Sequence, residues 1–147
     1  MPRFALLEHI GTPTYKPGAH YDLLLEAVAG DGMWAWELTS NPCDCGAGRR
    51  ENIPARRLPD HRTLYLDYEG PISGDRGNVR RIAAGEYRLS DSESEDTADW
   101  ISIEILGPAW QARIWLPLVL TPVDDVARVA QILNQSNEEA SFCDPVK

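Results

Sequence analysis

Histidine and cysteine are scarce in this chain, and long apolar runs are missing. The 147 residues include three histidines and three cysteines. An odd number of cysteines does not describe a disulfide framework, which favours a reducing cytoplasm. No stretch approaches the roughly eighteen consecutive apolar residues of a membrane span, and the start MPRFALLEH lacks the apolar region of a signal peptide. We therefore expect a cytoplasmic protein with no membrane partner.

Positive charge is also in deficit, and neither a P-loop nor a dinucleotide-binding fingerprint occurs. Fourteen Lys and Arg residues stand against 23 Asp and Glu residues, a net charge of −9. This balance argues against non-specific coating of nucleic acid, which depends on neutralising many phosphates. Residues 49–81, however, hold eight arginines and five acidic residues, a net of +3. A local cationic surface suits a single anionic group such as a phosphate, whereas the acidic run at 91–99 is typical of a solvated loop.

Length and composition indicate one globular domain. The chain is 43% hydrophobic and 25% charged, which is ordinary for a folded protein, and its length fits one domain rather than two. We expect this domain to cover residues 1–135 and to be followed by a loose C-terminal tail over residues 136–147.

Short β-type runs separated by turn residues dominate the pattern. The run Trp100–Leu106 places three isoleucines on one face at period two. Similar runs occur at Phe4–Glu8, Tyr21–Val28, Met33–Leu38, Thr63–Tyr68, Val79–Ile82, Glu86–Leu89 and Trp110–Leu120. Many short strands with turn signals between them predict a mainly-β protein, either an antiparallel sandwich or a barrel. The Cys-, Gly- and Arg-rich segment Asn41–Pro54 predicts a long loop.

One helix is predicted near residues 122–134. Thr121 suits the N-cap and Pro122 the first helical position, and two aspartates follow at the positive end of the helix dipole. Apolar residues then recur at helical spacing and would pack against the sheet: Val123, Val126, Ala127, Ala130 and Leu133.

The pair His20 and Asp22 is the most informative chemical feature. Residues i and i+2 of a strand point to the same face, so the imidazole and the carboxylate share one space. Such a pair is half of a divalent-metal site, and a further histidine would complete a two-histidine, one-carboxylate face. His9 ends a strand of its own and reaches the same place if the two strands pair. On spacing alone, such a pair is more often a hydrogen-bonded surface pair than half of a metal site, and both interpretations stay open.

Several short strings follow one another in a recognisable order. They are E-H at 8–9, H-Y-D-L-L-L-E at 20–26, W-x-W-E-L at 34–38, D-H-R-T-L-Y-L-D-Y-E-G at 60–70, I-S-G-D-R-G-N-V at 72–79 and G-E-Y at 85–87. In this order they resemble the motifs of the 3′-phosphoesterase domain of bacterial DNA ligase D and its stand-alone relatives. The resemblance covers residues 3 to about 90 by motif. The combination of the second and fourth strings is much more specific than either alone.

This resemblance implies a fold, an activity and a set of site residues. The family is a small antiparallel β-barrel of about eight strands with short peripheral helices, and it removes 3′-ribonucleosides and 3′-phosphates from DNA ends during break repair. His9, His20 and Asp22 align with its ligands for Mn²⁺, although Zn²⁺ or a similar ion is an alternative. His61 and Tyr65 align with catalytic residues that engage the phosphate. The implied partners are a 3′ end of DNA or of a DNA/RNA primer, or a small phosphate ester, with a ligase or polymerase beside it.

Two departures from the family pattern bear on activity. Leu24 stands where the family has an arginine, and ten residues rather than five separate His9 from His20. Arg76 in a Gly-flanked loop, or Arg62, is a candidate to bind the phosphate instead. The missing arginine and the net charge of −9 also support an alternative, a non-catalytic relative that binds metal and a phosphorylated ligand or partner.

Cysteine offers a second, weaker metal candidate. Cys43 and Cys45 with the distant Cys143 resemble part of a zinc site, but no fourth ligand lies beside them. Free thiols in a loop are the simpler interpretation.

Overall fold

A computed structural model of the protein describes residues 1–27, 32–46, 48–61, 63–90, 100–118 and 125–131. These residues form nine strands and two short 3-10 helices. The strands are β1 (Arg3–Thr12), β2 (Tyr15–Glu26), β3 (Met33–Leu38), β4 (Arg50–His61), β5 (Gly70–Pro71), β6 (Asn78–Leu89), β7 (Trp100–Leu106), β8 (Gln111–Pro117) and β9 (Asp125–Gln131). The 3-10 helices are η1 (Pro42–Asp44) and η2 (Thr63–Leu66). No helix among the described residues is long and apolar enough to cross a membrane.

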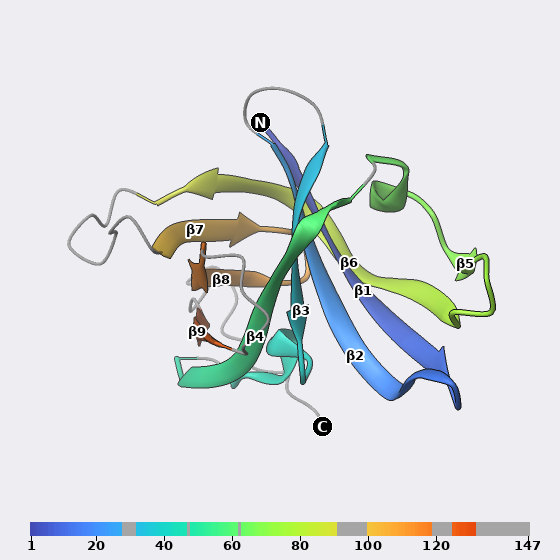
Figure 1. The fold of residues 1–147 in the computed structure, drawn as a ribbon. Coiled ribbons are helices and arrows are strands. Elements are labelled where there is room, and N and C mark those ends of the chain that lie inside the picture. Colours follow the sequence, from blue (N-terminus) through green and yellow to red (C-terminus); the bar gives the residue numbers. More distant parts are fainter. Residues whose placement is uncertain (28–31, 47, 62, 91–99, 119–124, 132–147) are drawn as a thin grey trace.

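All nine strands belong to one antiparallel sheet that closes on itself. The strand order is β1-β2-β3-β4-β9-β8-β7-β6-β5, and β1 also pairs with β6. The ring therefore contains every strand except β5, which pairs with the edge of β6 opposite β1. Figure 1 shows β5 and η2 at one end of the molecule and β7, β8 and β9 at the other. The prediction of a mainly-β antiparallel protein is confirmed.

Alternation along the first three strands builds two apolar clusters on opposite faces. Phe4, Leu23 and Trp36 belong to the main core, which all ring strands supply. Their neighbours in sequence point the other way and form a smaller cluster, which Leu66 of η2 joins. Successive strand residues face opposite sides of a sheet, so β1, β2 and β3 have no polar face over much of their length. The smaller cluster consists of Ala5, Leu7, Leu24, Met33, Ala35, Leu66 and Val79.

The predicted helix near 122–134 is wrong for residues 125–131, which form β9. In β9 the exposed Val126 is followed by Ala127 and Val129, which are both 0% exposed. Burial at every second residue is a strand pattern, and the apolar spacing of this segment fits both periods. Because β9 pairs with β4 on one side and β8 on the other, it is the strand that joins the two halves of the ring. The other predicted residues of this helix, and the predicted tail over 136–147, lie outside the described residues.

Further segments differ from the sequence prediction. The separate strands predicted at Val79–Ile82 and Glu86–Leu89 are parts of one strand, β6. Thr63–Tyr68 does not form a strand, because Thr63–Leu66 is the 3-10 helix η2. The predicted loop Asn41–Pro54 is too long at its C-terminal end, because β4 begins at Arg50. Strands β3 and β7 have the predicted limits.

A tight turn between β5 and β6 lies against β1. Gly77 has a φ of +97°, and a Cβ added there would overlap the carbonyl oxygen of Ile10. The turn is closed by the amide of Ile72, which donates to the Gly77 carbonyl at 2.8 Å. Glycine is needed at this position both for the left-handed backbone and for the close approach.

We expect Gly77→Ala to lower the free energy of unfolding more than Gly18→Ala does. The two glycines have similar φ angles, +97° and +87°, so each alanine carries about 1–2 kcal/mol of left-handed strain. Only at Gly77 does the new Cβ also collide with backbone, since nothing lies within 4 Å of the corresponding position at Gly18. Relieving that collision adds about 1–3 kcal/mol. Urea unfolding measures both losses, and equal losses would contradict the close approach.

Candidate metal centre

The pairing of β1 with β2 brings two histidines and an aspartate together. His9 of β1 lies directly opposite His20 of β2 in the antiparallel register, and Asp22 follows on the same face of β2. The imidazole ring centroids are 4.5 Å apart. All three residues are buried, with exposures of 7%, 8% and 6%. The sequence analysis expected His9 to reach His20 and Asp22 if the two strands paired. The strands do pair, and His9 lies at the expected place.

The donor atoms of these residues, called here the His9–His20–Asp22 cluster, converge on one point. His9 Nδ1 lies 3.8 Å from Asp22 Oδ2, and His20 Nε2 lies 3.5 Å from Asp22 Oδ1. One donor atom from each residue can be chosen so that all lie within 4.8 Å of one another. These separations are longer than good hydrogen bonds. The two nitrogen–oxygen distances are close to the about 3.0–3.5 Å that separates neighbouring ligands bound at about 2.0–2.2 Å to one ion.

The cluster fits a divalent cation by an independent criterion. Asp22 Oδ1 is buried and has no hydrogen-bond partner among the described residues. A buried carboxylate oxygen without a partner is costly, and a coordinated cation would satisfy it. Two imidazoles and one carboxylate are donors that suit manganese, iron, zinc and similar ions. The cluster could therefore hold a metal ion, whose identity the donor set leaves open.

A backbone carbonyl orients His9 for this task. His9 Nε2 lies 2.7 Å from the carbonyl oxygen of Arg76, so the Nε2–H donates to it. In the neutral ring this leaves the lone pair on Nδ1, the atom that faces Asp22. Metal-binding histidines commonly donate their second N–H in this way, which sets the tautomer and the ring angle. The turn that contains Gly77 supplies this carbonyl.

The two histidines differ in basicity. The Asp22 carboxylate facing the ring has the largest effect on His9 and raises its pKa above the usual value, and the Arg76 carbonyl adds to this against the opposing effect of burial. For His20 burial dominates and lowers the pKa, although the charge of Asp22 partly offsets it. His20 is therefore neutral at neutral pH, and His9 is the ring that holds a competing proton.

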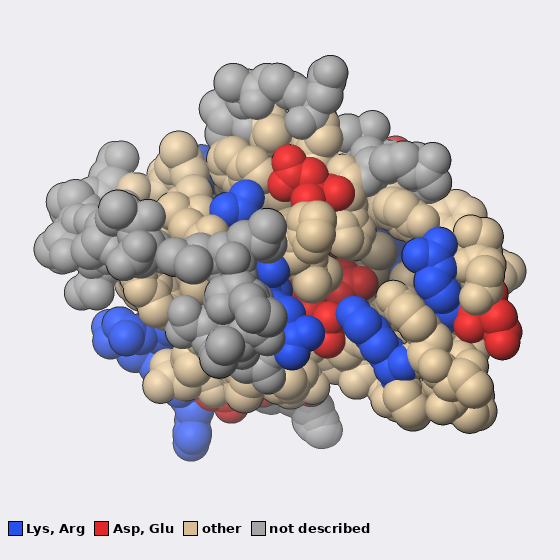
Figure 2. Space-filling view, viewed as in Figure 1, with Lys and Arg blue, Asp and Glu red and all other residues tan. Residues whose placement is uncertain are grey.

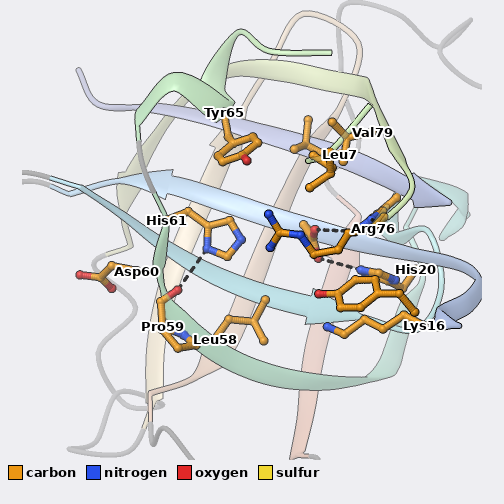
Figure 3. Close-up of a pocket in the computed structure, with 14 residues that line it drawn as sticks. Leu7, Lys16, His20, Leu58, Pro59, Asp60, His61, Tyr65, Arg76 and Val79 are labelled. Atoms are coloured by element: carbon orange, nitrogen blue, oxygen red, sulfur yellow. Dashed lines mark hydrogen bonds and ion pairs between the residues drawn. The ribbon is translucent and has the colours of Figure 1, made fainter. Parts of the chain in front are cut away.

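The cluster forms one side of a cavity of about 530 Å³. His61 and Tyr65 line the same cavity from the opposite side (Figure 3), with their ring centroids 6.0 Å apart. The two residues come from different elements, because His61 ends β4 whereas Tyr65, predicted to lie in a strand, belongs to η2. The fold nevertheless brings all five predicted metal and catalytic residues to one cavity. Its apolar lining consists of Leu7, Leu58, Pro59, Ile72 and Val79.

Of the two predicted phosphate-binding arginines, the structure places one. Arg76 lines the cavity, and its guanidinium donates from Nε to the Ser73 carbonyl at 2.7 Å and from Nη2 to Ser73 Oγ at 3.3 Å. Arg62 lies outside the described residues. Leu24 lies on the same face of β2 as His20 and Asp22, but it is fully buried in the smaller apolar cluster.

Among the lining residues that the sequence analysis missed are two neighbours with polar side chains, Tyr15 and Lys16. Both come from the hairpin that joins β1 to β2. Lys16 Nζ donates to Glu37 Oε1 of β3 at 2.8 Å. The ten-residue interval between His9 and His20 is the signal that could have found them. Tyr15 and Lys16 lie within this interval, and a long hairpin between two metal ligands begins and ends beside the metal site.

The cysteines supply no second metal site among the described residues. Within the part of the chain that the structure describes, neither Cys43 nor Cys45 belongs to a group of three donors that could hold a metal ion. Burial, with a smaller contribution from Asp44, raises the pKa of the Cys43 thiol to about 12. Cys143 lies outside the described residues.

A scan against protein-family models and a search of curated proteins both find no match to this chain. The resemblance to the ligase D phosphoesterase domain therefore remains a prediction that rests on the motifs.

We expect Mn²⁺ affinity to fall as the pH is lowered through the raised pKa of His9. Below that pKa the metal-free ring carries a proton that must leave before Nδ1 can coordinate. Above it the ring is neutral and affinity levels off, and His20 contributes little because its pKa is lowered. Calorimetry at about pH 6 and about pH 8, in buffers of different ionisation enthalpy, measures both affinity and proton release.

His61→Gln is the matched control for this experiment. It removes an imidazole from the same cavity but not from the His9–His20–Asp22 cluster, so Mn²⁺ affinity and its pH dependence should be unchanged. His9→Gln should lose both. A pH dependence that survives in His9→Gln would exclude His9 as the titrating ligand.

Proposed function

We propose that this protein is a metal-dependent phosphoesterase of the DNA ligase D 3′-phosphoesterase type. It would remove 3′-phosphates or 3′-ribonucleosides from DNA ends, or hydrolyse a related phosphate ester. The observation that carries the proposal is the buried His9–His20–Asp22 cluster on one side of a cavity with His61 and Tyr65 on the other. This is the set of residues that the motif resemblance assigns to the reaction.

The cluster would hold Mn²⁺ or a similar ion through His9 Nδ1, an imidazole nitrogen of His20 and the Asp22 carboxylate. When bound, such an ion polarises a phosphoryl oxygen and lowers the pKa of a water molecule. The work of the protein is to fix the geometry of these donors. The Arg76 carbonyl does this for His9, and the β1–β2 ladder does it for His20.

His61 and Tyr65 are placed to act on the phosphate from the side opposite the cluster. His61 Nδ1 lies 3.1 Å from the Pro59 carbonyl, so this nitrogen donates and Nε2 is left to the cavity, into which the ring points in Figure 3. A protonated Nε2 would donate to a phosphate oxygen or to the leaving oxygen. The Tyr65 hydroxyl would donate to a second phosphate oxygen.

The surface charge favours recognition of a strand end over coverage of a duplex. Figure 2 shows basic and acidic side chains interspersed on the face that it draws, with no continuous basic surface among the described residues there. Wide contact with a phosphate backbone needs many unopposed cations. A 3′ end requires only one phosphate to enter the cavity, in which Arg76 and Lys16 are the lining cations among the described residues.

The same proposal extends to the architecture and the setting. The closed ring of strands would correspond to the roughly eight-stranded barrel of the ligase D domain, with β5 as an addition at its edge. A cytoplasmic protein that cleans 3′ ends would work before a ligase or a polymerase, which need a free 3′-hydroxyl.

We expect the Mn²⁺-loaded protein to release phosphate from a 3′-phosphate DNA primer, or a nucleoside from a primer with one 3′-ribonucleotide. Asp22→Asn should lower turnover at least about 100-fold, because it removes the charged ligand between the two imidazoles. A quench assay resolved by gel electrophoresis measures both activities.

Asp60→Asn is the matched control. Asp60 also lines the cavity, but it is exposed and outside the His9–His20–Asp22 cluster, so turnover should change by no more than a few fold. If Asp22→Asn retained turnover, the assigned site would be wrong. Metal binding without turnover on either primer would favour the non-catalytic relative, which the loss of the family arginine at Leu24 also supports.

A further inference from the structure

The hairpin between β1 and β2 contains a bulge whose first residue has a strained backbone. The ladder pairs Thr12 with Tyr15 and Ile10 with Ala19, so only Gly11 stands opposite the three residues 16–18. Lys16 begins this bulge with a φ of +47°. A lysine in the left-handed region is unfavourable, and such strain persists only where the surrounding structure imposes it.

Gly11 allows the bulge to fold back over β1. A Cβ added at Gly11 would overlap the carbonyl oxygens of Tyr15 and Lys16. The backbone of Lys16 therefore lies directly on β1, two residues beyond His9. The consequence is that the Lys16 side chain leaves the hairpin on the side of the His9–His20–Asp22 cluster, where it lines the cavity.

The Lys16 ammonium is held in place but keeps donors for a ligand. Figure 3 shows the Lys16 and Arg76 side chains both reaching into the cavity beside the cluster. One N–H of Lys16 donates to Glu37 Oε1 at 2.8 Å, and an ammonium has three such donors. Burial lowers the pKa of Lys16, but the hydrogen bond and charge of Glu37 outweigh it and raise the pKa above its usual value. Lys16 is thus a permanent cation at neutral pH.

We propose that Lys16 is the anion-binding cation of this site and that it contacts the non-bridging oxygens of a phosphate bound at the His9–His20–Asp22 cluster, together with Arg76. The identity of the anion rests on the proposed phosphoesterase function. Leu24 stands where the ligase D pattern has an arginine. Its side chain is buried in the smaller apolar cluster and carries no charge. The extended hairpin supplies that charge from another direction.

Titration with inorganic phosphate tests this assignment on the Mn²⁺-loaded protein. We expect Lys16→Gln to weaken phosphate binding about tenfold or more, as a lost charge-assisted contact does. Lys16→Arg should stay within about threefold of the unchanged protein, because it keeps a cation with several donors. Mn²⁺ affinity in Lys16→Gln should be unchanged or tighter, since the loss of a nearby positive charge does not weaken cation binding. General damage to the site would weaken both.

Arg80→Gln is the matched control. It removes one positive charge and breaks an ion pair of the same 2.8 Å length, to Glu8, but Arg80 does not line the cavity. Phosphate affinity in this variant should stay within about twofold of the unchanged protein.

The double variant Lys16→Gln with Glu37→Gln removes a second explanation. In Lys16→Gln alone, the unpaired Glu37 carboxylate could repel phosphate. If that repulsion were the whole effect, the double variant would regain phosphate affinity, and the proposal would be overturned. We expect the double variant to remain weak, because the donors of Lys16 are still missing.

The outcomes separate this inference from the proposed function. Lys16→Gln with unchanged phosphate affinity, or an unchanged protein that binds no phosphate, overturns the inference whatever the turnover on DNA primers. Lys16-dependent phosphate binding with no turnover on any primer supports the inference and contradicts the phosphoesterase proposal. Urea unfolding of each variant confirms that it is folded.

Discussion

The antiparallel pairing of β1 with β2 is the constraint on which the candidate site depends. It sets His9 opposite His20 and leaves Asp22 on the same face. A shift of one residue in this register would turn the side chains of one strand to the opposite face. The register is held from both sides, because alternate residues of the same two strands enter the main core and the smaller apolar cluster. Packing of the apolar residues thus secures the geometry of the polar ones.

The polar groups at the site are costly in the metal-free chain, and the fold concentrates that cost in one place. A buried carboxylate with an unpartnered oxygen and a backbone strained at Lys16 both lie at one cavity. Unpartnered and strained groups are typical of functional sites, where a ligand completes the interactions. The two departures from the ligase D pattern also meet here. The longer interval before His20 forms the hairpin that carries Lys16, and the leucine on β2 becomes part of the apolar support beneath the cluster.

Much of the fold could be predicted from local pattern. Alternation predicted β3 and β7 with their observed limits, and the antiparallel, mainly-β class followed from many short runs. The segment that became β9 could not be decided locally, because its apolar residues fit two patterns. Val126, Ala127 and Ala130 follow a helical spacing, whereas Ala127 and Val129 follow a strand spacing. Pairing with β4 and β8 selects the strand, and this requires partners far away in the sequence. Local pattern also predicted a strand at Tyr65, whereas this residue lies in the 3-10 helix η2 at the cavity.

By itself the sequence determined the chemistry available to this protein: three histidines with no spares, an aspartate two residues after one of them, and one cationic segment on an acidic chain. Spacing along one strand also determined that His20 and Asp22 would share a face. Only the tertiary structure decided which cation reaches the site and what orients His9. Lys16 arrives through a bulge that lies on Gly11, and the Arg76 carbonyl arrives through a turn that lies on Ile10. Both are contacts of backbone against backbone. Glycine permits each close approach, but the backbone groups that it approaches are the same on every residue, so the sequence does not show which segment lies there.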